Sequence, residues 1–193
     1  GFFAAAILVP VTAAAMSPLL AWRQPVYIAA GFAGVIAMAL LLVQPLLAGG
    51  YLPGLPARRG RRVHRWTGGA LIVAIVAHIG GLWITSPPDM IDALLFRSPT
   101  PFSAWGVAAM WTAFGAALLA AFRARFRRNL RCWRRGHTAL VSMTVIGSVA
   151  HAMMVEGTME MVSKTLLCAC ALAATEKAVT DLRAWAIRTR RGS

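Results

Sequence analysis

The sequence contains only four histidines, and they form two equally spaced pairs. His64 and His78 are 14 positions apart (78 − 64), and so are His137 and His151 (151 − 137). Imidazole nitrogens bind transition metals and also relay protons. A single histidine in an apolar segment is more often a packing residue or a member of a proton relay. The repetition of one spacing across all four histidines favours metal ligation instead.

Helix geometry indicates how the members of each pair are placed. Fourteen residues rise roughly 21 Å along an α-helix and end only about 40° short of a whole number of turns. The two histidines of a pair therefore share one helix face, but they lie too far apart to hold one ion together. Each histidine needs a partner at the same depth on another helix.

The histidines lie along two of six apolar runs that are long enough to span a bilayer. These runs fall at 2–21, 26–48, 63–85, 104–122, 137–155 and 158–179. Of the 193 residues, 59% are hydrophobic and only 13% are charged, whereas soluble domains are about 45–50% apolar and about 25% charged. We therefore expect an all-α integral membrane protein, a six-transmembrane-helix bundle that forms a single domain over residues 1–193.

The basic residues predict the orientation of this bundle. Seventeen of the twenty Lys and Arg residues fall in three clusters, at 58–65, 123–135 and 177–191, and each cluster adjoins an apolar run. This is the positive-inside pattern of a membrane protein rather than the basic face of a nucleic-acid-binding domain. We therefore expect cytoplasmic basic loops, two cytoplasmic termini, a multi-pass location in a bacterial cytoplasmic membrane and no nucleic-acid partner.

The predicted topology pairs the histidines between helices. The two histidine-bearing runs are separated by one span, so both run from inside to outside, and side by side they place their histidines at matching depths. A haem fits between two imidazoles because its iron binds one on each face. Zinc would need further ligands, and no Cys, Asp or Glu lies at either depth. We therefore predict two haem b groups, an inner one with axial ligands His64 and His137 and an outer one with His78 and His151.

Charged and small residues surround both predicted sites. The candidate partners of the inner haem propionates are four arginines: Arg62, Arg65, Arg134 and Arg135. For the outer haem the candidates are Arg97 and Lys164. Glycines at 68, 69, 80, 81 and 147 would either let a flat macrocycle approach the backbone or serve ordinary helix packing. Near the outer end, Glu156, Glu160 and Lys164 would either line an acceptor site or, as is more common, anchor the helix at the interface.

The longest outer connection, at 86–103, has proline-rich ends that bracket the segment DMIDALLF. We expect this segment to form a short amphipathic helix that lies on the outer surface.

Two segments, HRWTGGALIVAIVAH and HTALVSMTVIGSVAH, resemble the histidine-bearing helices of the ferric reductase-like transmembrane family. That family includes ferric reductases, the membrane part of NADPH oxidases and the haem subunit of a bacterial methionine-sulfoxide reductase system. Its core of six helices carries two similarly spaced histidines on the third and fifth helices. The resemblance implies electron transfer from a cytoplasmic donor, through the inner and then the outer haem, to ferric iron, a periplasmic protein or a small oxidant outside.

The sequence departs from that family in two respects. No further histidine lies on the outer side, where oxygen-reducing relatives tend to present extra polar groups, so we do not expect superoxide production. The second departure concerns the reductase domain. Ferric reductases and NADPH oxidases usually continue into a flavin- and nicotinamide-binding domain, but here no G-x-G-x-x-G motif follows a strand. We therefore expect no such domain, and we expect electrons to come from a separate protein or from membrane quinol.

Two other functions stay open at this point. The chain could be a non-catalytic, haem-binding accessory subunit docked on a larger membrane complex, so an enzymatic, metalloreductase-like activity of its own is undecided. A haem-free proton or ion carrier could use the same histidines. It would need acidic partners in the membrane, and the apolar runs up to residue 155 contain no Asp or Glu.

Overall fold

Helices are the only regular secondary structure in the described part of the chain. The computed structural model describes residues 23–126, 128–156 and 161–188, with isolated positions before residue 23. The elements are α2 (Pro25–Gly49), α3 (Ala57–Thr85), α4 (Pro87–Leu94), α5 (Pro101–Ala121), the short 3-10 helix η2 (Phe122–Phe126), α6 (Leu130–Met154) and α7 (Met161–Arg188). The all-α prediction is confirmed for these residues. The first predicted span, 2–21, lies outside them apart from the isolated positions.

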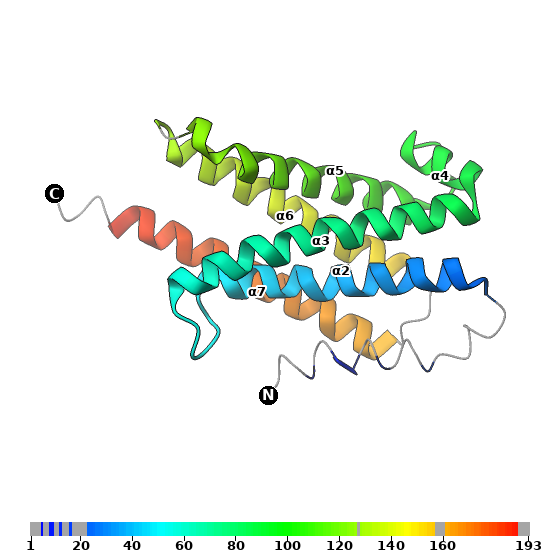
Figure 1. Cartoon of the computed structure of the whole chain (residues 1–193), viewed down its shortest axis with the longest axis horizontal. Coiled ribbons are helices and arrows are strands. Elements are labelled where there is room, and N and C mark those ends of the chain that lie inside the picture. The colour runs from blue at the N-terminus through cyan, green and yellow to red at the C-terminus, as the bar shows by residue number, and fades with distance from the viewer. Residues whose placement is uncertain are drawn as a thin grey trace.

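The long helices form one bundle, whose two ends differ (Figure 1). The α2–α3 and α5–α6 connections and the C-terminal end of α7 lie at one end, which we call the inner end. The start of α2 and the short helix α4 lie at the opposite, outer end. Helices α3 and α6 therefore run in the same direction, as the predicted pairing of the histidines requires.

Among the described residues, four helices are long and apolar enough to cross a membrane: Pro25–Gly49, Arg58–Thr85, Pro101–Phe126 and Leu130–Met154. They coincide with four of the six predicted runs. Helix α7 has 28 residues, but Lys164, Glu176 and Lys177 interrupt its apolar stretch. Length and composition alone therefore do not mark α7 as a membrane span.

The helices extend beyond the apolar runs that predicted them. Helices α3 and α6 begin at Ala57 and Leu130, so much of two basic clusters is helical, and the prediction that these clusters are loops is wrong. Hydropathy detects the part of a helix that suits lipid, whereas arginine and alanine favour helix formation in water as well. Helix α6 starts where Asn129 caps it, since the Asn129 side chain accepts a 3.1 Å hydrogen bond from the backbone N–H of Cys132.

Helices α2 and α3 pack as one hairpin, and α5 and α6 pack as another. A Cβ on Gly81 would lie 2.7 Å from the Cβ of Ala30, and one on Gly147 would lie 3.1 Å from the Cβ of Ala109. Small residues at such crossings are the usual means by which membrane helices approach closely. Of the two roles left open for the glycines, Gly81 and Gly147 therefore serve helix packing.

The outer connection contains the short helix that the sequence predicted. It is α4, which turns the chain between α3 and α5. Ala93 of α4 is buried and packs with Val107 and Met110 of α5. This contact holds α4 against the outer end of the second hairpin.

The apolar part of α7 packs against α2. Leu42 and Leu46 of α2 form a buried cluster with Leu167 and Ala171 of α7. Helix α7, which contains no histidine, thereby covers one side of α2.

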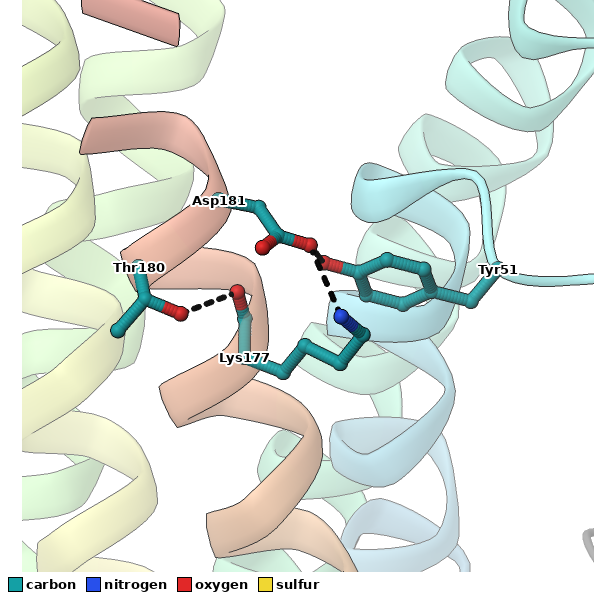
Figure 2. Close-up of polar contacts among 4 residues, drawn as sticks. All are labelled: Tyr51, Lys177, Thr180 and Asp181. Atoms are coloured by element: carbon teal, nitrogen blue, oxygen red, sulfur yellow. Dashed lines mark hydrogen bonds and ion pairs between the residues drawn. The ribbon is translucent and has the colours of Figure 1, made fainter. Parts of the chain in front are cut away.

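A polar cluster joins α7 to Tyr51, the second residue after the end of α2 (Figure 2). The hydroxyl of Tyr51 donates to the carboxylate of Asp181, and Lys177 Nζ lies 3.3 Å from the same carboxylate oxygen. The ammonium group of Lys177 also lies 5.0 Å from the centre of the Tyr51 ring. The cluster fixes α7 to the α2–α3 connection at the inner end.

Candidate functional site

The structure brings the two outer histidines together. The rings of His78 on α3 and His151 on α6 have centroids 6.4 Å apart, with their planes at 77°. A metal–imidazole bond is about 2 Å long, so two imidazoles that bind one ion from opposite sides have centroids roughly 6 Å apart. The spacing of this outer pair therefore suits the two axial ligands of one iron.

Each outer histidine is oriented by a backbone carbonyl of its hairpin partner. Nδ1 of His78 lies 2.8 Å from the carbonyl oxygen of Ala30 on α2, and Nδ1 of His151 lies 2.9 Å from that of Phe102 on α5. A carbonyl oxygen only accepts, so both Nδ1 atoms carry the proton and donate it. The other ring nitrogen, Nε2, then keeps its lone pair available for a metal.

Two glycines permit these hydrogen bonds. Gly34 and Gly106 lie four residues after the acceptor carbonyls, so they occupy the next turn of the same helix. A Cβ on Gly34 would lie 3.0 Å from Nδ1 of His78, and a Cβ on Gly106 would lie 2.7 Å from Nδ1 of His151. A side chain at either position would occupy the space through which the ring reaches the carbonyl.

The inner pair, His64 and His137, makes looser contacts with the backbone. Nδ1 of His64 lies 3.2 Å from the carbonyl oxygen of Gln44 on α2. Nδ1 of His137 is buried without a full hydrogen bond, and the carbonyl of Ala116 on α5 is the acceptor that faces it. The two rings lie close enough to interact electrostatically. The ring of His137 also stacks on Trp133, with centroids 5.3 Å apart and planes at 6°.

The acceptor carbonyls repeat the spacing of the histidines. Positions 30 and 44 on α2 are 14 apart (44 − 30), and positions 102 and 116 on α5 are also 14 apart (116 − 102). Four residues later the chain has glycine at the outer level but alanine, Ala48 and Ala120, at the inner level. The additional methyl groups fit the longer inner contacts.

An apolar layer lies between the two levels. Leu41 of α2, Leu71 of α3 and Val145 of α6 form a buried cluster. Leu71 follows His64 by seven positions and precedes His78 by seven, so this cluster lies midway between the pairs. It separates the two candidate sites with side chains that neither carry charge nor bind water.

The four predicted partners of the inner haem propionates lie near the inner end. Arg62 and Arg65 are exposed on α3 and line an open hollow together with Trp66. Arg134 and Arg135 are exposed on the first turns of α6. Within the part of the chain that the structure describes, none of the four forms an ion pair. Their guanidinium groups are therefore able to meet carboxylates from another molecule.

The polar residues at the outer end have separate surroundings. Lys164 is only 4% exposed, and its ammonium group donates a 3.0 Å hydrogen bond to the carbonyl of Val155, which follows the last turn of α6. Lys164 thus caps α6 from α7. Arg97 and Glu156 are exposed, and Glu160 lies outside the described residues.

The donor set fits haem better than a bare metal ion. In residues 23–126, 128–156 and 161–188, no three His, Cys, Asp or Glu side chains gather in one place. The porphyrin supplies four of the nitrogen ligands of a haem iron, so the protein has to supply only two. Each histidine pair contains two imidazoles. The candidate sites therefore have the ligand number that a haem requires.

The sequence did not reveal three residues that shape these sites: Gly34, Gly106 and Gln44. All three lie on helices that carry no histidine, so their role depends on which helix faces which. Only their positions could have indicated them. When α2 and α5 are placed antiparallel to α3 and α6, each of the three residues lies close to the membrane depth of a histidine.

Comparison with known proteins gives one match. The family model described as ferric reductase like transmembrane component matches residues 30–148, which is more than half of the chain. The matched region runs from the start of α2 into α6 and includes three of the four histidines. No curated protein and no solved structure is similar enough to count as a match.

Proposed function

This chain belongs to the family of ferric reductase-like transmembrane components, and we propose on that premise that it is a di-haem b protein that transfers electrons across a membrane. The family and the four apolar helices identify a multi-pass membrane protein and support transmembrane electron transfer in general. The observation that carries the finer proposal is the orientation of the rings. Three of the four histidines direct Nδ1 at a backbone carbonyl, which leaves Nε2 to bind iron.

The residues of the chain have distinct roles in this proposal. His64 and His137 hold the inner haem, and His78 and His151 hold the outer one. Each haem iron supplies a reversible one-electron couple. The carbonyls of α2 and α5 orient the imidazoles and select the tautomer, while the apolar layer at Leu71 keeps water and protons out of the space between the levels.

The proposed direction is from the cytoplasm of a bacterium outward. The basic inner end attracts an acidic electron-donor protein, although membrane quinol is the other class of donor that we consider. The acceptor outside is ferric iron, a periplasmic protein or a small oxidant. In this proposal the chain acts as the electron-transfer subunit of an oxidoreductase system.

A reduced-minus-oxidised optical spectrum of the purified protein tests this function, together with pyridine haemochrome quantitation of haem per chain. We expect two b-type haems per chain. One haem would keep the class of function but contradict the paired sites. No haem, in folded protein expressed with sufficient haem, would refute the proposal.

The variant His78→Leu separates the two sites. It should remove the outer haem and leave the inner one, so that haem per chain falls by half. Equal loss of both haems, in a variant whose helical circular dichroism matches that of the parent, would show that the sites are not separable.

A further inference from the structure

Gln44 is a buried polar residue on a helix that carries no predicted ligand. Gln44 is only 7% exposed, and the other buried residues of α2 are apolar. A buried amide is costly unless it is hydrogen-bonded, and Gln44 finds its partners on α3. One atom of its terminal amide lies 2.7 Å from Nδ1 of His64, and the other lies 2.8 Å from the hydroxyl of Thr67.

The amide of Gln44 has two orientations, and each requires a different tautomer of His64. With its nitrogen toward the ring, the amide donates to Nδ1 of His64 and to the His64 carbonyl at 3.3 Å, and its oxygen accepts from Thr67 and from the backbone N–H of Gly68 at 2.9 Å. Nδ1 is then unprotonated, so the ring proton lies on Nε2. With the amide reversed, its oxygen faces Nδ1 and its nitrogen donates to the hydroxyl of Thr67. The oxygen then lies 3.3 Å from the His64 carbonyl oxygen, and the nitrogen lies 2.9 Å from the backbone nitrogen of Gly68.

Iron ligation selects the second orientation. An imidazole that binds iron through Nε2 carries its proton on Nδ1, and an amide nitrogen opposite that proton would place two donors against each other. We propose that Gln44 is the positioning residue of His64 at the inner site: its amide oxygen accepts the Nδ1 proton of His64, and its amide nitrogen donates to the hydroxyl of Thr67. This inference rests on the proposed function, because it requires a haem at the inner site.

The inner level needs this additional acceptor because its backbone contact is weaker. The outer histidines lie 2.8 and 2.9 Å from their carbonyls, beside glycines that leave the path open. His64 lies 3.2 Å from the carbonyl of Gln44, and the amide of the same residue supplies a second, closer acceptor. The equivalent position on α5 is Ala116, so His137 has no such side chain and its Nδ1 stays without a full hydrogen bond.

The proposed hydrogen bond affects the reduction potential of the inner haem. An acceptor on Nδ1–H makes the imidazole a more basic ligand, which stabilises ferric over ferrous iron and lowers the potential. An ordinary packing residue at position 44 would instead change stability without a predictable sign in the potential.

The test is a redox titration of the purified, haem-loaded protein, in the full chain and in the His78→Leu background where the inner haem remains. Gln44→Met keeps the length of the side chain and removes the acceptor, so the ferric-to-ferrous ratio at a fixed potential should fall. A tenfold fall corresponds to a rise of about 59 mV for a one-electron couple. Gln44→Glu places an oxygen toward Nδ1 whether or not it is ionised, so the potential should stay at or below the parent value.

Two threonines of α3 provide a matched pair. Each threonine hydroxyl hydrogen-bonds to carbonyls of the preceding turn, but only Thr67 also contacts Gln44. Thr67→Val should shift the inner potential in the same direction as Gln44→Met, and Thr85→Val should leave it unchanged. If Gln44→Met does not fold, Thr67→Val and Gln44→Glu decide the question.

The outcomes separate this inference from the function beneath it. If the parent protein binds two haems, and the Met and Glu variants shift the inner potential in the same direction or not at all, Gln44 is not the positioning residue. If the parent protein binds no haem at the inner site, the proposed function fails and this inference falls with it.

Discussion

At the scale of single residues, the position of each outer histidine depends on a residue that it does not bind. A carbonyl inside a helix already accepts a hydrogen bond from the N–H four residues later. An imidazole can donate to the same oxygen only where the later residue leaves room. Gly34 and Gly106 provide that room for His78 and His151. The orientation of a histidine ring on one helix thus depends on the absence of a side chain on another.

Adding a methyl group at either glycine should therefore weaken binding of the outer haem. The effect should be larger where the added Cβ lies closer to the histidine ring. Gly106→Ala places a Cβ 2.7 Å from the His151 ring and should have the larger effect, and Gly34→Ala, at 3.0 Å from the His78 ring, should have the smaller. Loss of the ring's hydrogen bond costs about 1 kcal/mol, and the displaced packing adds roughly 1–3 kcal/mol. Pyridine haemochrome quantitation should show haem per chain falling toward one.

Gly31→Ala is the matched control, since a Cβ at this position of α2 would have no neighbour within 4 Å. It should keep the full haem content. If all three glycine variants bind haem equally, the close approach of the rings to the carbonyls is not needed for ligation.

The phenol of Tyr51, which lies outside the spanning segments, should make the stability of the fold depend on pH. Burial, then the hydrogen bond to Asp181 and the charge of Asp181, raises the pKa of Tyr51 from its ordinary value of 10.0 to about 12. The same hydrogen bond, followed by that from Lys177, lowers the pKa of Asp181. Because the folded chain holds the phenolic proton more tightly, this contribution to stability is complete below about pH 10 and is lost as the pH rises through about 12.

Absorbance at 295 nm can follow this ionisation. The chain has two tyrosines, so Tyr27→Phe leaves Tyr51 as the only phenol. The tyrosinate should form near pH 12, and adding Asp181→Asn should lower the midpoint toward its ordinary value. A midpoint that Asp181→Asn leaves in place would assign the shift to burial alone. Circular dichroism at each pH shows whether the helices persist.

At the scale of helices, the sequence predicts the pairing of the outer histidines but not the residues that orient them. Hydropathy and the 14-residue spacing were sufficient to place His78 and His151 at one level, because both properties belong to a single helix. The contacts of Gln44, Gly34 and Gly106 depend on how α2 and α5 rotate against α3 and α6. That rotation is set by small-residue crossings such as Gly81 on Ala30, which a linear pattern does not specify. The predicted helices were also shorter than the observed ones, because hydropathy reports suitability for lipid rather than backbone hydrogen bonding.

Helix α7 should contribute to stability rather than to haem binding, and two adjacent leucines test this. Leu167 is 1% exposed in the cluster with Leu42, whereas Leu166 is 43% exposed. Leu167→Ala should cost about 2–5 kcal/mol through the cavity that it leaves, and Leu166→Ala should stay within about 0.5 kcal/mol. Thermal unfolding in detergent would measure both. Both variants should retain the haem content of the parent, and a selective loss of haem in Leu167→Ala would give α7 a direct part in the site.

At the scale of the whole molecule, the basic residues and the two histidine levels are distributed along the same axis of the bundle. The α2–α3 and α5–α6 connections lie at one end of the bundle with the C-terminal end of α7 (Figure 1), and the described parts of the three basic clusters fall there. Lipid bilayers orient such chains with the basic end in the cytoplasm. The two histidine levels are stacked along this axis, so the orientation of the bundle decides which pair meets a cytoplasmic donor first.

The exposed thiol of Cys132 can report this orientation, because Cys132 lies near the start of α6 at the inner end. In a Cys168→Ala, Cys170→Ala background it becomes the only thiol. A membrane-impermeant maleimide should label it in inverted vesicles and leave it unlabelled in intact cells. Asp92→Cys, on the exposed surface of α4, with Cys132→Ala in addition, should give the reverse pattern. If Cys132 reacts in intact cells and the cysteine at position 92 does not, the bundle is inverted. The pair at His78 and His151 would then face the cytoplasm, and the proposed direction of electron transfer would be wrong even if both haems were present.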